Sequence, residues 1–516
     1  MNRREFLQFL GVSGAAITLP NQVLSASKKL TTPQWQSLPV SLEDKLTTIS
    51  GIDYKILIKW GDAINPNDKF GFNNDYLAFH ALNKNHGILW ANHEYVNPVF
   101  INGKERTKQN VDLEMKEVGG SLIEIEKKNN QWQLVKNSKF NRRLDANTPI
   151  PFAGGVEVEG SKIALGTLAG CAGGKTPWGT VLSCEENYDM FWGDRDRKKQ
   201  ETTKAWMEWT KIYQRPPEHY GWVVEINPTT GEAKKHTSLG RCAHECATIT
   251  KAKNGKIIAY TGDDCPNQHL YKLISDSDKS IEKGKLYVAS LEKKEWISLQ
   301  IDEQEILKKN FKNQLEVLTH LREAAKLVGA TPLDRPEDIE IDPLTGNIFI
   351  ALTNNKTKNN YVGSILKIIE SGNDHGSLKF EHENFLTGGK NQGFACPDNM
   401  AFDPKGNLWF TTDMHGSEIN KGEYQGLGNN ALYVFIRDGK HKGEVIRVAI
   451  APVEAEFTGP CFSPDYKTLF LSVQHPGEMS ESKDKLTSKW PDGDIPRPAV
   501  VTLQGPFLDQ IIQGKL

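Results

Sequence analysis

Short clusters of acidic residues recur along the chain, each beside a short apolar run. The clusters are Asn92-His93-Glu94, Cys184-Glu185-Glu186-Asn187, His244-Glu245, Asp263-Asp264, Glu337-Asp338 and Pro397-Asp398-Asn399. One acidic pair at a turn is usually only solvated, but six such clusters indicate a shared role. If the fold brings them together, their carboxylates repel one another unless protons or cations neutralise them. Ca²⁺, which takes about six to eight oxygen ligands, suits this set of Asp, Glu and Asn side chains.

Two cysteines add a different type of ligand to these clusters. Cys171 and Cys184 lie 13 residues apart. If 182–186 is a strand, Cys184 and Glu186 lie on the same face of it. A thiolate beside carboxylates favours a softer transition metal such as iron, in addition to any Ca²⁺. For either cysteine taken alone, a disulfide or a buried thiol is the alternative.

A repeated pattern predicts the elements that position these residues. Segments 335–350 and 396–410 both read as a strand, a turn with Asp-Pro and Gly-Asn, and a second strand, and a third copy begins at 459. The first prolines of the copies are at 336, 397 and 460, which gives steps of 61 and 63 residues. A unit of this length fits a four-stranded sheet, and radial packing of such sheets gives a β-propeller with a central channel. Three coincidental turns in unrelated sheets are the alternative.

The predicted fold is all-β, a single six-bladed β-propeller over 27–516. The blade number follows from about 480 residues after the leader at roughly 60 to 80 residues per blade. Two charged segments, near 194–216 and 302–329, interrupt the β pattern. The second of them has apolar residues at steps of three and four from Leu307 to Leu321. We expect both to be helical insertions that cover the propeller.

Composition narrows the class of protein without naming it. The chain has 516 residues, with 63 Lys and Arg against 65 Asp and Glu, and a net charge of -2. This composition can bury a core, so disorder is not expected. The balanced charge gives no general attraction to nucleic acid, and no nucleic-acid binding is expected.

The N-terminus has the features of an export signal. Arg3-Arg4-Glu5-Phe6-Leu7 is followed by an apolar stretch to Leu19 and by small residues at Ser25-Ala26. The twin arginines predict a signal peptide over 1–26 that uses the twin-arginine export machinery, with the mature chain in the periplasm or outside the cell. An amphipathic N-terminal helix is the alternative. No other apolar stretch is long enough to span a bilayer, so stable membrane insertion is not expected.

Several longer motifs resemble those of one enzyme family. They are Phe70-Gly71-Phe72-Asn73-Asn74-Asp75-Tyr76, Trp90-Ala91-Asn92-His93-Glu94-Tyr95, Cys171-Ala172-Gly173-Gly174, Thr176-Pro177-Trp178-Gly179-Thr180, Tyr260-Thr261-Gly262-Asp263-Asp264, 329–337 and Gln474-His475-Pro476-Gly477. Together they resemble the PhoX family of alkaline phosphatases, which are exported and calcium-dependent. The resemblance extends over nearly the whole chain.

The resemblance implies a mixed cluster of Fe³⁺ and Ca²⁺ that hydrolyses phosphomonoesters. It implies Cys171 as the iron thiolate, with Cys184 as the second candidate. The carboxylates expected to hold the cluster are those of Glu186, Glu245, Glu337 and Asp398, and Asn92 and Glu94 are further candidates. Arg335 is expected to bind the phosphate, because its planar guanidinium suits phosphate oxygens. Arg335, Glu337 and Asp263 are the residues expected to be catalytic.

The expected reaction is attack of a metal-activated oxygen on phosphorus while Arg335 and Ca²⁺ hold the phosphate group. Small-molecule phosphate esters are the expected substrates, and a monomer is expected. Two alternatives remain at this point. One is a calcium-dependent propeller lactonase or arylesterase, and the other is a propeller that only binds partners. Cys242, Cys246 and Asp338 depart from the family's usual pattern, which leaves substrate preference open.

Overall fold

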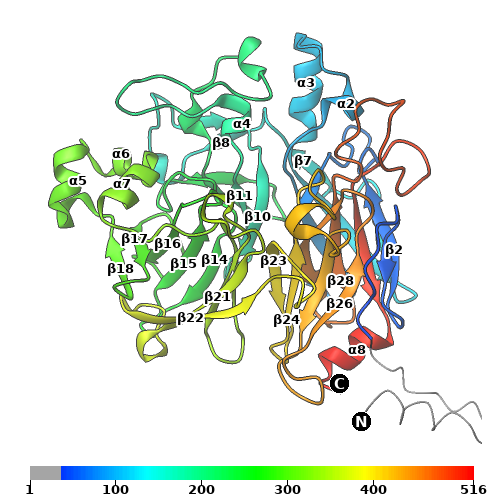
Figure 1. The fold of residues 1–516 in the computed structure, drawn as a ribbon. Coiled ribbons are helices and arrows are strands. Elements are labelled where there is room, and N and C mark those ends of the chain that lie inside the picture. Colours follow the sequence, from blue (N-terminus) through cyan, green and yellow to red (C-terminus); the bar gives the residue numbers. More distant parts are fainter. Residues whose placement is uncertain (1–35, 516) are drawn as a thin grey trace, which may run out of the picture. The chain divides into compact units, whose positions relative to one another are not determined.

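The computed structural model describes residues 36–515, which form six antiparallel sheets arranged as the blades of a propeller (Figure 1). Blade 1 comprises β3 (Asn74–Asn83), β4 (His86–His93), β5 (Gly119–Lys128) and β6 (Gln131–Leu134), and β7 (Arg142–Leu144) also pairs with β5. Blade 2 comprises β10 (Gly170–Lys175), β11 (Val181–Glu185), β12 (Val223–Ile226) and β13 (Ala233–His236). Blade 3 comprises β14 (Thr248–Lys251), β15 (Ile257–Gly262), β16 (Leu270–Ser275), β17 (Gly284–Ser290) and β18 (Glu295–Ser298). The predicted fold class is confirmed.

Of the remaining three blades, the last two combine late strands with an early strand of the described chain. Blade 4 comprises β19 (Pro336–Ile341), β20 (Ile348–Leu352), β21 (Ser364–Glu370) and β22 (Phe380–Thr387). Blade 5 comprises β23 (Pro397–Phe402), β24 (Leu408–Thr412), β25 (Ala431–Phe435), β26 (Val445–Ile450) and β1 (Thr47–Thr48). Blade 6 comprises β27 (Glu456–Phe462), β28 (Leu469–Gln474), β29 (Ala499–Gln504) and β2 (Asp53–Lys59). The early strands β1 and β2 thus complete blades 5 and 6. This pairing closes the ring and covers strand edges that would otherwise be exposed.

The first strand of each blade lies innermost, and neighbouring first strands contact one another around the channel. The second strand of each blade is buried along almost its whole length, as in β4, β11, β15 and β24. Packing against the adjacent blades covers both faces of these strands. This explains why they are continuous apolar runs, such as 87–91 and 256–260, rather than alternating ones. The similar run at 162–166 belongs to β9 (Ile163–Leu165), which pairs with β8 (Pro149–Pro151) outside the blades.

Short helices lie mainly in the connections between strands. Segment 302–329 contains α5 (Glu305–Asn310), α6 (Gln314–Thr319) and α7 (Leu321–Leu327), which pack on the outer side of blades 2 and 3. The helical expectation for 194–216 is wrong, because this segment is mostly irregular and contains only a 3₁₀ turn at Trp209–Lys211. The other α-helices within residues 36–515 are α2 (Pro98–Ile101), α3 (Lys108–Glu117), α4 (Asp189–Trp192) and α8 (Pro506–Ile512). Within the described range, no helix is both long and apolar enough to cross a membrane. The predicted signal peptide lies outside the described residues.

Long insertions follow the second strands of blades 1, 2, 5 and 6, whereas the insertion with α5 to α7 follows the last strand of blade 3. Residues between β4 and β5 form α2 and α3, and residues between β11 and β12 form α4 and the irregular segment. In Figure 1, α2, α3 and α4 lie together at one end of the propeller. In an antiparallel pair, the end of the second strand lies beside the start of the first. The insertions that follow second strands therefore stand at the end of the channel where the innermost strands begin.

A buried ion pair anchors one of these insertions to its blade. Lys235 Nζ lies 2.7 Å from Glu185 Oε1, and both side chains are fully buried. Glu185 also accepts hydrogen bonds from the backbone N–H groups of Gly221 and Trp222, at 3.0 and 3.2 Å. Lys235 donates to the carbonyl oxygen of His219 at 2.9 Å. The pair thus joins the inner part of blade 2 to the end of the irregular insertion.

Replacing Lys235 with Met should lower the free energy of unfolding by about 3–5 kcal/mol, because it leaves the Glu185 carboxylate buried without its partner. Urea unfolding followed by circular dichroism measures this change. The control is Lys379→Met, which breaks an ion pair with Glu295 whose lysine side chain is 62% exposed. This control should cost less than about 1 kcal/mol. Equal losses in the two variants would contradict the anchoring role.

Candidate metal centre and active site

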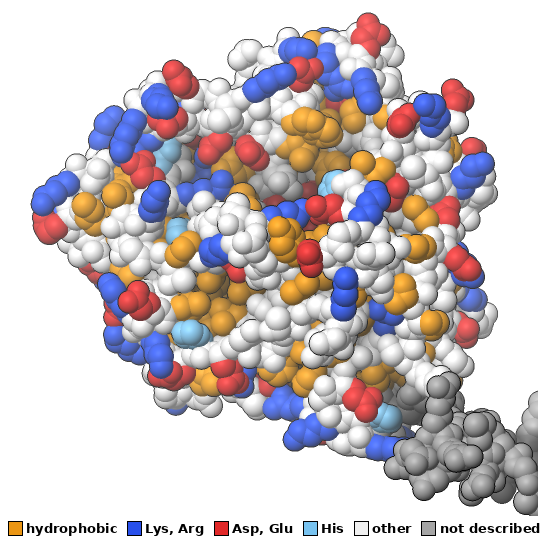
Figure 2. Space-filling model, viewed as in Figure 1, with side chains coloured by type: hydrophobic (Ala, Val, Ile, Leu, Met, Phe, Trp, Pro, Cys, Tyr) orange, Lys and Arg blue, Asp and Glu red, His pale blue; other side chains and the backbone are white. Residues whose placement is uncertain are grey.

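The channel opens into a cavity of about 390 Å³ at the end where the innermost strands begin. Figure 2 shows a hollow in the upper part of the molecule's face, with acidic and hydrophobic side chains around it. Ten carboxylic acids line the cavity, together with Cys171, Arg335, His415 and His475. So many carboxylates around one small space repel one another more strongly than water alone can compensate, so they require neighbouring positive charge.

Two sets of strand ends supply most of these side chains, whereas Glu245 comes from the loop before β14. The second residue of four innermost strands faces the cavity, namely Asp75 of β3, Cys171 of β10, Glu337 of β19 and Asp398 of β23, and Glu456 is the first residue of β27. The other set comes within two residues after the second strands and comprises Glu94, Glu186, Asp264, Asp413 and His475. Equivalent positions of successive blades therefore converge on one axis, as the repeat predicted.

A backbone feature precedes four of the innermost strands. Asn73, Ala169, Arg335 and Cys396, each directly before the first residue of its strand, have positive φ angles of 41°, 52°, 56° and 54°. Residues other than glycine rarely adopt this left-handed conformation, and it costs about 1–3 kcal/mol each. The surrounding blades impose it at the same place in each repeat, and the turn it makes comes immediately before the residues that face the cavity.

The innermost strand of blade 2, β10, requires glycine at position 174 because another backbone lies very close to it. A Cβ atom on Gly174 would lie 2.0 Å from the carbonyl oxygen of Ala247, in the next blade. Blade 2 therefore approaches blade 3 more closely than a side chain permits. A bulge between Gly170 and Gly173 shifts the register of β10 against β11 at Cys171.

Seven of the side chains form a continuous series of metal-ligand groups. In each of three groups, Asp75–Glu94–Cys171, Cys171–Glu186–Glu245 and Glu245–Glu337–Asp398, the ligand atoms lie within 4.8 Å of one another. Cys171 joins the first group to the second, and Glu245 joins the second to the third. Two of the groups therefore contain the thiol, which suits a softer transition metal. The third group, at the all-carboxylate end of the series, suits Ca²⁺.

Unpaired buried oxygens show that the series fits cations. Asp75 Oδ1, Glu245 Oε2 and Glu456 Oε2 are buried and have no hydrogen-bond partner within residues 36–515. Such atoms cost about 1–3 kcal/mol each when nothing compensates them. A bound cation supplies the missing partner and the missing charge at once.

The pKa values of these groups reflect the same crowding. Burial raises the pKa of Glu245 well above its ordinary value, and the carboxyls of Glu337 and Glu186 raise it further. Burial likewise raises the pKa of the Cys171 thiol, with Asp75 adding to the effect. All of these directions oppose the anionic forms that bind metal. A cation inverts them, because its charge favours the thiolate and the carboxylates.

Among the described residues that line the cavity, Arg335 is the one lysine or arginine. Its Nε and Nη2 donate to the two carboxylate oxygens of Asp264, at 2.9 and 2.7 Å, and Nη2 also lies 2.8 Å from Glu337 Oε1. Nη1 lies 3.6 Å from Asp413 Oδ2, too far for a direct hydrogen bond. Burial acts to lower the pKa of Arg335, but Asp264, Glu337 and Asp413 hold it above the ordinary value. The guanidinium is thus fixed on one side and keeps Nη1 for another anion.

The structure brings together most of the residues singled out in the sequence. Cys171, Glu186, Glu245, Glu337, Asp398, Glu94 and Arg335 all line the cavity. Cys184 does not, because it is fully buried in a hydrophobic cluster with Leu182 and Val223. The strand β11 ends at Glu185, so the alternation that placed Cys184 and Glu186 on one face does not extend to Glu186. No disulfide forms, since all seven cysteines are free thiols.

Asn92 and Asp263 also lie outside the cavity lining and are used in other contacts. Asn92 donates to the backbone carbonyls of Cys171 and Ala172. Its Oδ1 accepts from Trp90 Nε1 at 2.6 Å and from Ser183 Oγ at 2.7 Å. It therefore fixes the backbone that carries Cys171 and has no free oxygen for a metal. Asp263 forms a two-point ion pair with Arg322, at 2.8 and 2.5 Å. Its neighbour Asp264 is the residue that faces the cavity.

Four cavity acids were missed in the sequence: Asp75, Asp413, Glu478 and Glu456. For Glu456, the repeat contained a signal that locates the strand on which it lies. Aligning the copies on their second prolines, at 343, 404 and 464, gives steps of 61 and 60 and places the third strand start near 457. The register agrees, because Phe402 pairs with Leu408 in blade 5 and Phe462 pairs with Leu469 in blade 6. Pro460 therefore lies inside β27 and is not equivalent to Pro397.

Comparison with known proteins agrees with this geometry. The family model described as alkaline phosphatase PhoX matches residues 33–477. A solved structure of Pseudomonas fluorescens PhoX in complex with vanadate, a transition state analogue, is 29% identical, with a TM-score of 0.82 over 92% of this chain and 98% of that one. A Dyadobacter fermentans protein of unknown function has a TM-score of only 0.37 at 10% identity, covering 89% of this chain and all of that one. No curated protein sequence matches this chain significantly.

The chain belongs to the PhoX family of alkaline phosphatases, because the family model covers most of its length. It is therefore an enzyme of the phosphatase class built on a six-bladed propeller.

The two cysteines provide a direct test of the ligand series. Cys171→Ala should lower the metal content per chain, because Cys171 belongs to two of the three ligand groups. Cys184→Ala is the matched control, since this thiol lies in the hydrophobic cluster, and should leave the metal content unchanged. Elemental analysis of both purified, folded variants measures the result. A loss of metal in Cys184→Ala alone would refute the assignment.

Proposed function

We propose that this chain hydrolyses phosphomonoesters in the central cavity with a mixed centre of iron and calcium. The observation that carries the proposal is the series of seven ligand side chains that lies beside the fixed guanidinium of Arg335. The Pseudomonas fluorescens protein, which binds vanadate, supports the phosphoryl-transfer chemistry. A lactonase or a binding platform needs neither the thiol nor the arginine, so we do not favour those alternatives.

The donor set suggests how the metals are distributed. Cys171 is the softest donor of the series, so iron fits between Asp75, Glu94, Glu186 and this thiol. Calcium fits the carboxylate end, at Glu245, Glu337 and Asp398. When bound, these metals supply Lewis acidity towards the phosphoryl oxygens and activate an oxygen nucleophile.

Arg335 has the role of orienting the phosphate. Asp264 holds its Nε and Nη2, so the guanidinium plane is set before the substrate arrives. Nη1 then donates to an equatorial oxygen as negative charge develops there. Asp413 Oδ2 lies 3.6 Å from Nη1, and its carboxylate helps to raise the pKa of Arg335 above the ordinary value. The positive φ of Arg335 fixes the direction from which the side chain enters the cavity.

Small-molecule phosphate esters are the proposed substrates, because the cavity of about 390 Å³ suits a phosphate with a modest organic group. The twin arginines at 3 and 4 support export by the twin-arginine machinery to the periplasm or beyond. Export in the folded state is consistent with metals whose proposed ligands come from five different blades. We propose that the enzyme acts as a monomer.

Metal removal should abolish the activity. The purified protein is expected to contain iron and calcium by elemental analysis and to hydrolyse p-nitrophenyl phosphate. Treatment with EGTA should stop the hydrolysis, and added Ca²⁺ should restore it, because the all-carboxylate end loses its cation first. Hydrolysis that persists in protein shown to be free of metal would refute the mechanism.

Arg335→Ala should lower kcat by about two to three orders of magnitude, because it removes a donor to the charge that develops on phosphate. The metal content should remain normal, since Arg335 is not a metal ligand. Arg335→Lys should recover only part of the rate, as an ammonium cannot bind Asp264 and phosphate as a planar fork does. Arg437→Ala, which breaks an ion pair with Asp342 away from the cavity, is the control. Near-normal turnover in Arg335→Ala would exclude the proposed role.

A further inference from the structure

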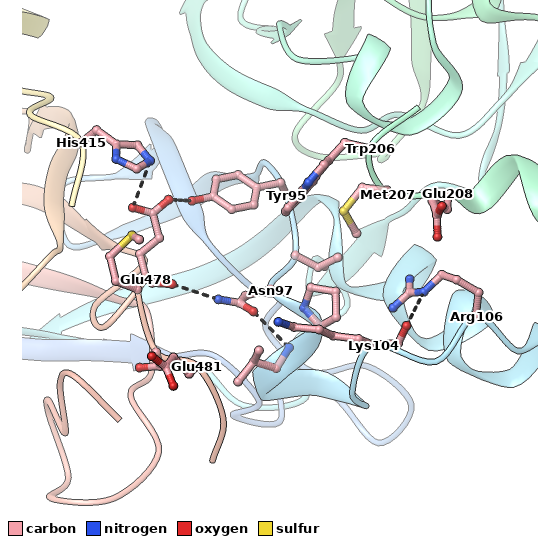
Figure 3. A pocket seen from close by; sticks show the side chains of 15 residues that line it. Tyr95, Asn97, Lys104, Arg106, Trp206, Met207, Glu208, His415, Glu478 and Glu481 are labelled. Atoms are coloured by element: carbon pink, nitrogen blue, oxygen red, sulfur yellow. Dashed lines mark hydrogen bonds and ion pairs between the residues drawn. The ribbon is translucent and has the colours of Figure 1, made fainter. Parts of the chain in front are cut away.

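A second and larger cavity, of about 580 Å³, lies beside the metal centre (Figure 3). Four connections between strands build it. Tyr95 to Val99, Lys104 and Arg106 come from the connection that carries α2 and α3, Trp206 to Glu208 come from the irregular insertion of blade 2, and His415 and Glu478 to Glu481 come from the connections of blades 5 and 6. All of these connections follow second strands, so they stand at the same end as the metal centre.

The two cavities share a wall. Tyr95, Trp206, His415 and Glu478 line both of them. Tyr95 is held in place because its hydroxyl donates to Glu478 Oε1 at 2.9 Å. A molecule with its phosphate at Arg335 and the ligand series can therefore extend its organic part past Tyr95 and Trp206 into the second cavity.

Trp206 is the most exposed large hydrophobic side chain within residues 36–515, with 66% of its surface accessible. Its indole makes no hydrogen bond with the described residues, and in Figure 3 it lies near Tyr95 and Met207 on one side of the pocket. Leaving an indole in water forgoes the free energy of burying a large apolar surface. A flat aromatic ligand placed against Trp206 recovers this free energy.

Lys104 gives the cavity an available positive charge. Its ammonium has no ion pair or hydrogen bond with the described residues, whereas Arg106 is held by Glu114 at 2.8 Å. The acids at the rim are also paired, Glu208 with Lys211 at 2.7 Å and Glu481 with Lys485 at 2.8 Å. Of the charged side chains in this cavity, Lys104 is thus the cation left for a ligand.

We propose that the second cavity is the leaving-group subsite, and that it selects phosphomonoesters whose organic part is an aromatic ring bearing an anionic group. The ring lies against Trp206, and the anionic group faces Lys104. This inference rests on the proposed function, because it places the phosphate at Arg335. During hydrolysis the bond between phosphorus and the ring-bearing oxygen breaks, water supplies the new oxygen on phosphorus, and the leaving oxygen takes a proton.

Trp206→Ala tests the subsite without touching the metal ligands, and the exposure of this side chain means that the variant should fold. Its kcat/KM for p-nitrophenyl phosphate should fall about tenfold, mainly through KM, because the stacking surface is lost. Its kcat/KM for glycerol 3-phosphate should change less than about twofold, since this ester has no ring. Trp206→Phe should restore most of the preference. Leu344→Ala, at an exposed hydrophobic residue outside both cavities, should change neither value.

Lys104→Ala tests the charge. It should reduce the preference of the enzyme for 4-carboxyphenyl phosphate over phenyl phosphate by about fivefold, and leave glycerol 3-phosphate unaffected. Equal losses for the aromatic and the glycerol ester in Trp206→Ala would overturn the subsite, as would no loss for either. An unchanged carboxylate preference in Lys104→Ala would overturn the assignment of the anionic group.

A binding measurement separates this inference from the proposed function. Calorimetry with the metal-loaded protein should show that phenylphosphonate binds more tightly than methylphosphonate, and that Trp206→Ala removes the difference. If the wild-type protein hydrolyses none of the esters yet shows this aryl preference, the proposed function fails and the subsite stands. If it hydrolyses both kinds of ester but binds the two phosphonates equally, the subsite fails and the proposed function stands.

Discussion

Repulsion among buried carboxylates is the interaction on which the site of this protein depends. Burial and neighbouring acids raise the pKa of Glu186, Glu245, Glu337 and Asp398. Contacts within a single blade would not stabilise such a group of acids. It is tolerated because six blades hold the strand ends in place from outside, and because cations compensate the charge that the fold concentrates. The balanced net charge of -2 conceals this local excess.

Antiparallel pairing of the strands determines at which mouth of the channel the other functional side chains lie. The start of a first strand is beside the end of a second strand, so both kinds of strand end supply residues to one mouth of the channel. Every insertion after a second strand then stands at that mouth and can shape what enters it. Most of the proposed metal ligands therefore lie at the strand ends of the repeats, whereas Trp206 and Lys104 lie in the irregular connections. In the proposed mechanism, the repeats thus hold the reacting phosphate and the connections contact the organic part of the substrate.

Arg335 belongs to the repeated part of the fold and is also proposed to contact the substrate. It is the residue before an innermost strand, in the left-handed conformation that also occurs at Asn73, Ala169 and Cys396. The same backbone turn thus carries a counter-charge in blade 4 and neutral side chains in the other three blades. Its contacts with Asp264 and Glu337 neutralise part of the acidic crowding and also fix the guanidinium for an incoming anion. Structural neutralisation and the proposed phosphate binding are thus two uses of one side chain.

The sequence by itself determined the six-bladed propeller and most of the ligand series, because the repeat recurs at nearly constant spacing and identical backbone positions must converge on the axis. It also determined the family, through motifs that surround those positions. Only the tertiary structure decided between Cys171 and Cys184, between Asp264 and Asp263, and against Asn92, because which of two neighbouring side chains faces the channel depends on where a strand ends and where a bulge shifts its register. It alone also revealed the second cavity, whose walls come from insertions that are distant in sequence and have no repeat to relate them.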